Sequence, residues 1–349
     1  EFANEQMPVT EQYLNLTPAE VEYVARLQNQ IFEQHKYERR TFPVQGLNGT
    51  DTLVADHPDW IYRYNFLYDN CTTRAVDAIK ATLKAHGETL VFPNLKRDKS
   101  VMTQLDMIHE FTKSSPWYQF GQDLLIGPEV DRKFNAEEQL RYNFLPTYAL
   151  RIFDAAQIRG RDGKLRPLVL SKAPLLPMVT SPQQKATPLT PMVVFGILFA
   201  FSLLLTFGQW RARKEAPVMQ RAWRIWSLSF DTVLFVGLSV VGILLTIMIG
   251  WSEHPAVGTN YLYVIFNPFM LLFLLSLYLP RAVAFRKVMA VLAIVGVLGY
   301  FVVFFLGFQQ FPLATVPIAL ILLVRSAMIA YTSCDIAHHA RHRVAHSLR

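Results

Sequence analysis

The sequence has few cysteines and lacks the motifs of several common enzyme classes. Only Cys71 and Cys334 occur in 349 residues, and neither belongs to a spacing typical of zinc sites. The chain also has no Gly-rich phosphate loop, no Gly-x-Ser-x-Gly elbow and no convincing pair of catalytic carboxylates. We therefore expect no metal and no cofactor.

Acidic residues are scarce in the second half of the chain. Residues 188–349 contain 4 Asp and Glu against 12 Lys and Arg, whereas residues 1–187 contain 23 against 22. The formal net charge of +7 thus comes from the apolar half and not from a polar, basic domain. This distribution argues against a nucleic-acid partner, because such proteins gather their positive charge on a polar surface.

The apolar half predicts an all-α bundle of five transmembrane helices over residues 192–333. Each of its long apolar runs is close to the ~20 residues that cross a bilayer. The runs lie at about 192–210, 226–250, 261–279, 288–308 and 312–333. Lys and Arg occur in the first and third loops and in the tail, 334–349, but not in the other loops. By the positive-inside rule the basic segments are cytoplasmic, and residues 1 to about 187 lie outside.

Few ionisable residues fall within these runs. Arg325 lies near the cytoplasmic end of the fifth run, so we expect its side chain to snorkel toward the interface. Asp231 lies near an end of the second run. These groups look isolated in the sequence, which makes a proton or ion path a weak hypothesis.

Proline marks the boundary between the two halves. Residues 171–191 contain five prolines, which exclude a helix and favour an extended spacer. The domains are therefore predicted as an exported domain over 1–170, the spacer, the membrane domain and the basic tail. In the exported domain we predict a strand at Tyr62–Tyr68 and helices at about 18–34, 71–86, 99–113 and 136–158. The exported domain is thus of mixed α and β class.

Cys71 stands where the predicted strand gives way to a helix. The partial positive charge at a helix start favours a thiolate, and the backbone N–H groups of Thr72 and Thr73 are expected to stabilise an oxyanion beside the sulfur. The alternative is a small buried apolar side chain, which is a common role for free cysteine. Cys334 is predicted at the cytoplasmic end of the fifth span, so it cannot form a disulfide with an external Cys71. An unpaired thiol in an oxidising compartment indicates reactivity.

The neighbours of Cys71 suggest further roles. Asn70 or Asp69 is expected to cap the helix, and Arg74, one turn along, to hold a carboxylate or phosphate. The candidate catalytic set is thus Cys71 with Asn70, Thr72 and Arg74, and Asp69 is a possible orienting group.

Two blocks of sequence resemble a known family. These are YNFLYDNCTTRAVDAI and PWYQFGQDLLIGPEVDRKFNAEEQ, the latter followed by FLPTYALRIFDAAQI. They are similar to the later part of the periplasmic domain of Lnb-type lipoprotein N-acyltransferases, over about residues 10–160. The resemblance implies an α+β papain-like exported domain of the permuted NlpC/P60 type and a multi-span tail. It also implies a location in the bacterial inner membrane, with the exported domain in the periplasm and the C-terminus in the cytoplasm.

The resemblance further implies a reaction. Cys71 would take an acyl chain from a membrane phospholipid as a thioester and pass it to the N-terminal α-amine of a lipoprotein. The family's general base is expected in a Gly-His-Thr motif upstream of the cysteine, and no such motif occurs in this sequence. Because the chain opens on Glu1 and shows no export signal, we expect native sequence upstream that supplies this base and more of the sheet.

Weaker candidates and rival functions remain open. His57 is the best of the external histidines as a base, and His254 is a possible substrate contact at the membrane face. Asp131 lies in the second resembling block and is a possible orienting group. The rivals to an acyltransferase are a cysteine hydrolase acting on cell-envelope substrates and a non-catalytic envelope scaffold.

Overall fold

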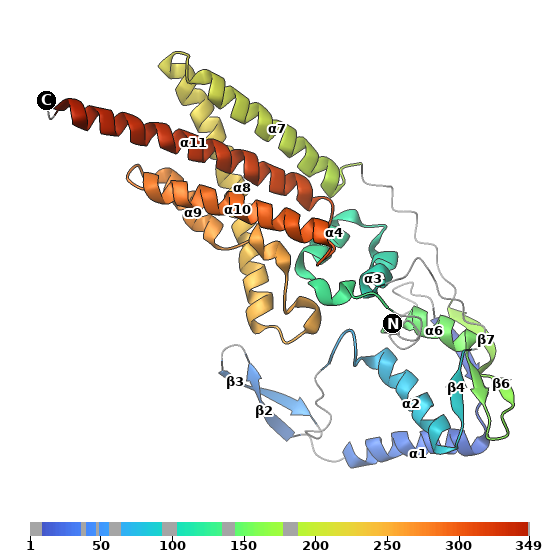
Figure 1. Ribbon diagram of the computed structural model, residues 1–349. Coiled ribbons are helices and arrows are strands. Elements are labelled where there is room, and N and C mark those ends of the chain that lie inside the picture. Colours follow the sequence, from blue (N-terminus) through green and yellow to red (C-terminus); the bar gives the residue numbers. More distant parts are fainter. Residues whose placement is uncertain are drawn as a thin grey trace. The chain divides into compact units, whose positions relative to one another are not determined.

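The computed structural model describes residues 9–35, 40–46, 49–55, 64–92, 103–134, 144–176 and 188–347, with side chains throughout these ranges except at 30–55 and 335–347. Within it the chain forms two compact units (Figure 1). The first, here the thiol unit, comprises Glu1–Asp106 and Lys133–Lys185. The second, the membrane unit, comprises Met107–Arg132 and Ala186–Arg349. The predicted domain boundaries did not anticipate that a segment of the polar half groups with the apolar helices.

The thiol unit combines helices with small antiparallel sheets. Its helices are α1 (Pro18–His35), α2 (Cys71–Ala85) and α6 (Pro146–Ala155). Strand β1 (Val9–Leu14) pairs with β7 (Val169–Leu176), and β2 (Arg40–Gly46) forms a hairpin with β3 (Gly49–Ala55). A three-stranded sheet has the order β4 (Thr89–Val91), β5 (Gln157–Arg159) and β6 (Leu165–Pro167). Each helix coincides with a predicted one, so the mixed α and β class is confirmed.

A small apolar core joins α2 to the three-stranded sheet. Leu83 of α2, Ile158 of β5 and Leu168 are fully buried together. Beside it, Arg166 donates to both carboxylate oxygens of Glu20 at 3.0 Å and to Glu88 at 2.9 Å. Glu20 also accepts from the Thr17 N–H at 2.6 Å, so its carboxylate caps the start of α1. The guanidinium of Arg166, which belongs to β6, therefore links this strand to α1 and to the residue before β4.

The spacer begins later than its proline content suggested. Residues 171–176 are extended, as expected, but they belong to β7 and pair with β1. The register shifts beside Pro174, which has no N–H to donate to the ladder. Residues 177–187, the middle of the predicted spacer, lie outside the described residues.

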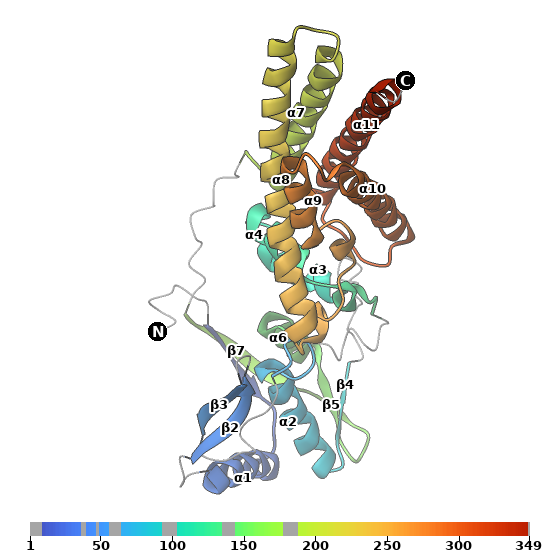
Figure 2. The same cartoon turned by 90° about the vertical axis from the view of Figure 1, so that its left-hand side faces the viewer.

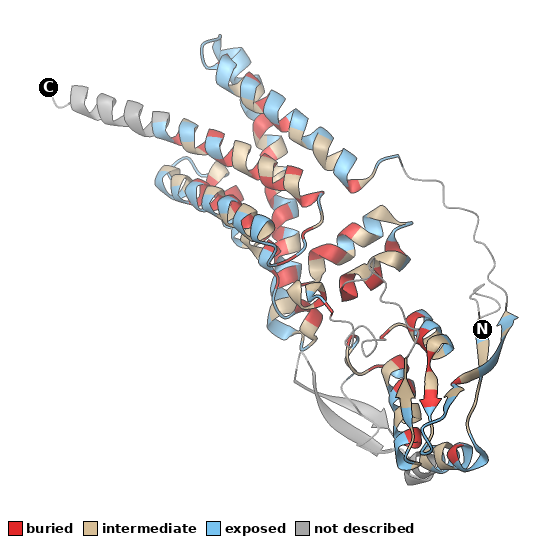
Figure 3. Cartoon of the chain, turned by 45° about the vertical axis from the view of Figure 1, so that its right-hand side comes forward, coloured by how far each residue is buried: buried red, intermediate tan, exposed pale blue. Residues whose placement is uncertain are grey.

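The membrane unit contains five segments long and apolar enough to cross a bilayer, which confirms the predicted number of spans. The helices are α7 (Pro191–Ala212), α8 (Pro217–Trp251), α9 (Phe269–Tyr278), α10 (Val283–Leu306) and α11 (Thr315–Ser347). Figure 2 shows α7 and α8 as a hairpin, and α7 also packs on α11. Because α9 packs on α8 and α10, and α10 on α11, the spans close into a ring. Exposed residues follow the outer faces of these helices (Figure 3), as expected where lipid replaces water.

The third span is not one continuous helix, contrary to the prediction. The 3-10 turns η3 (Pro255–Val257) and η4 (Tyr261–Val264) precede α9, and Pro268 separates them from it. The break packs closely against α8, where a Cβ on Gly242 would overlap the backbone of Asn267. Irregular backbone of this kind is tolerated at membrane depth where protein covers it.

Arg325 does not snorkel, and this prediction was wrong. The side chain is fully buried and forms a bidentate pair with Asp231, with Nε to Oδ1 at 2.6 Å and a terminal nitrogen to Oδ2 at 2.8 Å. It also donates to Thr206 at 2.8 Å and to Gln209 at 3.3 Å. The pair joins α7, α8 and α11, so the two groups that looked isolated in sequence neutralise each other inside the ring.

A hydrogen-bond network attaches part of the Met107–Arg132 segment to the membrane helices. The amide nitrogen of Asn260 donates to the carbonyls of Leu124 and Ile126 at 2.9 and 3.3 Å. The amide nitrogen of Gln309 donates to Ile126 at 3.0 Å and to the Asn260 side chain at 3.2 Å. Both amides are at least 96% buried, so each bond satisfies a group that water does not reach.

Neighbouring backbone contacts complete this attachment. The Gly127 N–H donates to the Ala256 carbonyl at 2.7 Å, and a Cβ on Gly127 would overlap the Thr259 carbonyl. Asp131, at the end of the 3-10 helix η2 (Pro128–Asp131), accepts from the Gln310 N–H at 2.6 Å. The segment thus lies against the loop between α8 and α9 and the loop between α10 and α11. Both loops are at the end of the ring opposite the Arg-rich loops.

Breaking the buried ion pair should destabilise the ring. We expect Asp231→Leu alone to cost about 3–5 kcal/mol, because it leaves the Arg325 charge buried without its partner. Thermal unfolding in detergent, followed by the loss of monodisperse protein, measures this change. The double variant Asp231→Leu, Arg325→Met should recover most of the lost stability. An equal loss of stability in the single and the double variant would contradict a stabilising ion pair between the two residues.

Removing the buried amides should release the attached segment. We expect Gln309→Ala or Asn260→Ala to raise amide hydrogen exchange in residues 116–131 by tenfold or more, because each deletes hydrogen bonds worth about 1 kcal/mol or more. Gln310→Ala is the matched control, since Gln310 is exposed and contributes its backbone N–H. Unchanged exchange in Gln309→Ala would show that the network does not hold the segment.

Candidate thiol site

A tight turn, and not the predicted strand, leads to the cysteine. The Asn65 side-chain oxygen accepts from the N–H groups of Leu67 and Tyr68, both at 3.1 Å. Asn65 and Asp69 also exchange backbone hydrogen bonds at 3.0 Å. An asparagine that bonds the backbone ahead of it closes the chain into a turn, and this local preference overrides the alternation of aromatics. The strand prediction was therefore wrong over its described part, residues 64–68.

Asn70 fixes the start of α2. It is 2% exposed, and its side-chain oxygen accepts from the N–H groups of Thr72 and Thr73, both at 2.9 Å. Its amide nitrogen donates to the carbonyls of Phe66 and Phe144 at 2.8 and 2.9 Å. The predicted cap is thus confirmed as Asn70, which also anchors the helix start to two other segments. Its geometry is that of a positioning residue.

Cys71 is the first residue of α2, and its side chain is exposed. We expected the N–H groups of Thr72 and Thr73 to stabilise an oxyanion, but in this structure both donate to the Asn70 cap. The Cys71 N–H has no acceptor among the described residues. This N–H, next to the sulfur in the chain, is therefore the backbone donor that remains for a ligand oxygen.

Arg74 is bound to an internal carboxylate. Its Nε donates to Asp69 Oδ1 at 2.7 Å, and a terminal nitrogen donates to Oδ2 at 3.0 Å. This hydrogen bonding and charge hold the pKa of Asp69 below its usual range. Both side chains are about half exposed, so water weakens the pair. In this structure Arg74 closes the turn onto the helix, and a substrate anion would have to compete with Asp69.

Within the thiol unit, no histidine with a described side chain lies beside Cys71. His57, the preferred base, lies outside the described residues. His86 caps the far end of α2, about 22 Å along a helix of this length. His254 belongs to the membrane unit, where its Nδ1 accepts from the Ala256 N–H at 3.2 Å and burial lowers the pKa of its imidazole.

The membrane unit holds a histidine and carboxylate pair that the sequence did not reveal. His109 Nε2 lies 2.8 Å from Asp123 Oδ1, and Asp123 is 8% exposed. The two residues come from α3 (Gln104–Thr112) and α4 (Pro116–Leu125), which their spacing of fourteen residues does not show. A carboxylate orients an imidazole and stabilises its charged form, so the pair is chemically competent for proton transfer.

An apolar groove of about 520 Å³ runs along the membrane unit. Its walls come from α4, α7, α8 and α11, and include Phe120, Leu124, Phe195, Phe230, Leu238 and Ile318. Trp117 contacts Phe120 and Phe195 edge-on, and its Nε1 donates to the Leu189 carbonyl at 2.8 Å. Trp117 and Phe120, which follow Pro116, therefore join α4 to α7. Phe120 also lines a cavity of a size that accepts an alkyl chain.

These features define a multi-pass membrane protein with an α and β unit that presents an exposed thiol. Residues 182–335 match the family model of the Lnb transmembrane domain. The match supports the predicted relationship to Lnb-type lipoprotein N-acyltransferases for the membrane part of the chain, and it does not include the two sequence blocks that carried the resemblance. Comparisons with curated proteins and with solved structures gave no match.

Removing the cap should loosen the start of α2. We expect Asn70→Ala to cost about 1–2 kcal/mol locally, because Thr72 and Thr73 lose their acceptor. Amide hydrogen exchange at residues 72–74 measures the loss, and the rate at which a maleimide labels Cys71 reports the altered position of the thiol. Asp77→Asn, an exposed change in the same helix, is the control. Exchange and labelling unchanged in Asn70→Ala would contradict the positioning role.

Proposed function

We propose that the protein is a membrane-anchored thiol acyltransferase that moves an acyl chain from a phospholipid to the N-terminal amine of a lipoprotein. The observation that carries the proposal is an exposed cysteine at a capped helix start, in a chain whose membrane part matches the Lnb transmembrane domain. A papain-like fold for the thiol unit belongs to the same proposal. It is supported by α2 and the antiparallel sheet β4–β5–β6 that packs on it.

The proposed reaction has two balanced steps. The Cys71 thiol gives its proton to a base, its sulfur attacks the ester carbonyl of the phospholipid, the carbon–oxygen bond breaks, and the lysophospholipid alkoxide takes up that proton. The lipoprotein amine then attacks the thioester, the carbon–sulfur bond breaks, and an amide forms while the proton lost by the amine passes through the base to the departing sulfur. In both steps the negative charge that develops on the carbonyl oxygen would be met by the Cys71 N–H.

The membrane unit supports a lipid donor. Its groove is lined by aromatic and aliphatic side chains, so it suits the hydrocarbon of a phospholipid or lipoprotein. In this proposal the thiol unit lies in the periplasm of an inner-membrane protein, which is the orientation that the positive-inside rule predicts from the basic loops. A buried and unreactive Cys71 would favour the scaffold alternative, whereas the thiol is exposed.

Intact mass spectrometry tests the acyl-enzyme directly. Incubation of the detergent-solubilised protein with phospholipid should add one fatty-acyl mass, which hydroxylamine removes, because thioesters react with it readily. Cys71→Ala should carry no adduct, while Cys334→Ala, which removes the other thiol, should behave as wild type. An adduct retained in Cys71→Ala would refute the proposed nucleophile, and peptide cleavage without any lipid adduct would favour the hydrolase.

A further inference from the structure

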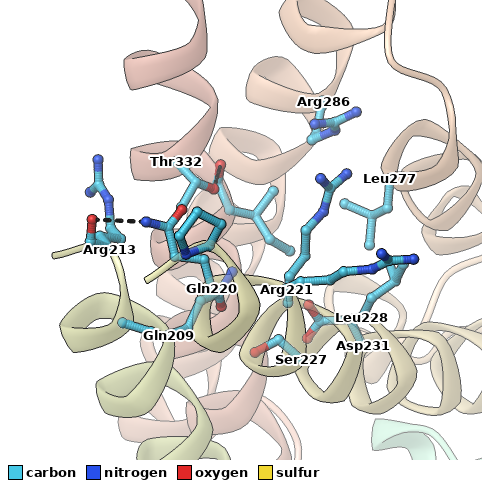
Figure 4. A pocket seen from close by; sticks show the side chains of 14 residues that line it. Gln209, Arg213, Gln220, Arg221, Ser227, Leu228, Asp231, Leu277, Arg286 and Thr332 are labelled. Carbon is cyan, nitrogen blue, oxygen red and sulfur yellow. Dashed lines mark hydrogen bonds between the residues drawn. The ribbon is translucent and has the colours of Figure 1, made fainter. Parts of the chain in front are cut away.

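A second, polar pocket of about 600 Å³ opens at the Arg-rich end of the membrane unit (Figure 4). Side chains from α7 to α11 line it. Arg213, Arg221, Arg224 and Arg286 provide its positive charge, and Gln209, Gln220, Ser227, Asp231 and Thr332 add polar groups. The thioester chemistry proposed for Cys71 makes no use of this pocket.

Part of the positive charge of this pocket has no acidic partner within the described protein. Its one acidic lining residue, Asp231, is already bound in bidentate fashion by Arg325. Arg221 and Arg224 form no ion pair with any described acidic residue. Three or more guanidinium groups around one cavity repel each other, and an anion between them relieves that repulsion.

Arg286 is held in place at the pocket wall. Its Nε and a terminal nitrogen donate to the Ser276 carbonyl at 3.0 and 2.7 Å, and the terminal nitrogen also donates to the Leu279 carbonyl at 3.0 Å. These carbonyls end α9, so they fix the guanidinium at the C-terminus of that helix. A positioned guanidinium loses less conformational freedom when it binds an anion.

Ser227 gives independent support for a ligand. It lines the pocket and is 2% exposed, and its hydroxyl has no hydrogen-bond partner among the described residues. A buried hydroxyl without a partner costs free energy, and a ligand oxygen supplies the missing bond. The pocket thus combines unbalanced positive charge with an unsatisfied buried donor.

We propose that this pocket binds the phosphate group of an anionic phospholipid. Neighbouring apolar side chains favour a lipid over a soluble anion, because Ile225 and Phe285 directly adjoin the lining residues Arg224 and Arg286 in the chain and are about half exposed, which provides a surface for acyl chains. The inference goes beyond the acyl donor at Cys71. It assigns a separate lipid site at the end of the ring that carries the basic loops.

Native mass spectrometry of the full chain in detergent tests this site. Phosphatidylglycerol should bind to the wild type at least about tenfold more tightly than zwitterionic phosphatidylethanolamine or inorganic phosphate. Arg221→Gln with Arg224→Gln should weaken phosphatidylglycerol about tenfold or more, and Ser227→Ala should weaken it several-fold. Arg211→Gln with Lys214→Gln is the matched control, since it removes the same charge from the same loop region outside the pocket lining.

The outcomes separate the possible explanations. Equal loss in the pocket and control variants would show that general surface charge attracts the lipid, and would overturn the site. Inorganic phosphate binding as tightly as phosphatidylglycerol would assign a soluble anion instead. If the double arginine variant is not monodisperse, the Ser227→Ala variant provides the test. Unchanged affinity of a folded Ser227→Ala variant for phosphatidylglycerol would overturn the proposed phosphate contact.

Discussion

The membrane unit depends on two buried amides, Asn260 and Gln309, which bind the carbonyls of Leu124 and Ile126. These carbonyls end α4, where a helix leaves acceptors that need partners. The amides belong to the two loops that have no Lys or Arg, so one network satisfies the helix end and fixes both loops at once. Part of the polar half of the chain is thereby built into the membrane unit, together with the apolar groove that Phe120 helps to line.

A second constraint acts at the other end of the ring. The Arg325–Asp231 pair crosses from α11 to α8 and is extended to α7 by Thr206 and Gln209. Asp231 is the one acidic residue in the described lining of the polar pocket, and it already pairs with Arg325. The other arginines of the lining therefore do not share this carboxylate, and they can bind an anionic ligand. The same interaction therefore stabilises the helices and sets the electrostatics of the pocket.

The sequence predicted structure correctly where the signal lies within a few neighbouring residues or extends along a long apolar run. Five apolar runs predicted five spans, and Asn70 before Cys71 predicted the cap, because capping depends on neighbours within three residues. Prediction from the sequence failed where residues that are far apart in the chain contact each other. Arg325 was expected to snorkel because Asp231 lies 94 residues away, and the pairing of His109 with Asp123 depends on the packing of two helices. The aromatic run before Cys71 was misread because one Asn65 side chain closes a turn.

The break in the third span makes this span depend on its neighbours. A helix of ten residues such as α9 is about 15 Å long, roughly half of the hydrocarbon thickness. The remaining depth is crossed by 3-10 turns and Pro268, where the backbone is not a continuous helix. Leu262 and Ile265 of this stretch are fully buried, so protein and not lipid covers them. The third span therefore takes from its neighbours a shielding from lipid that a continuous helix supplies through its own backbone hydrogen bonds.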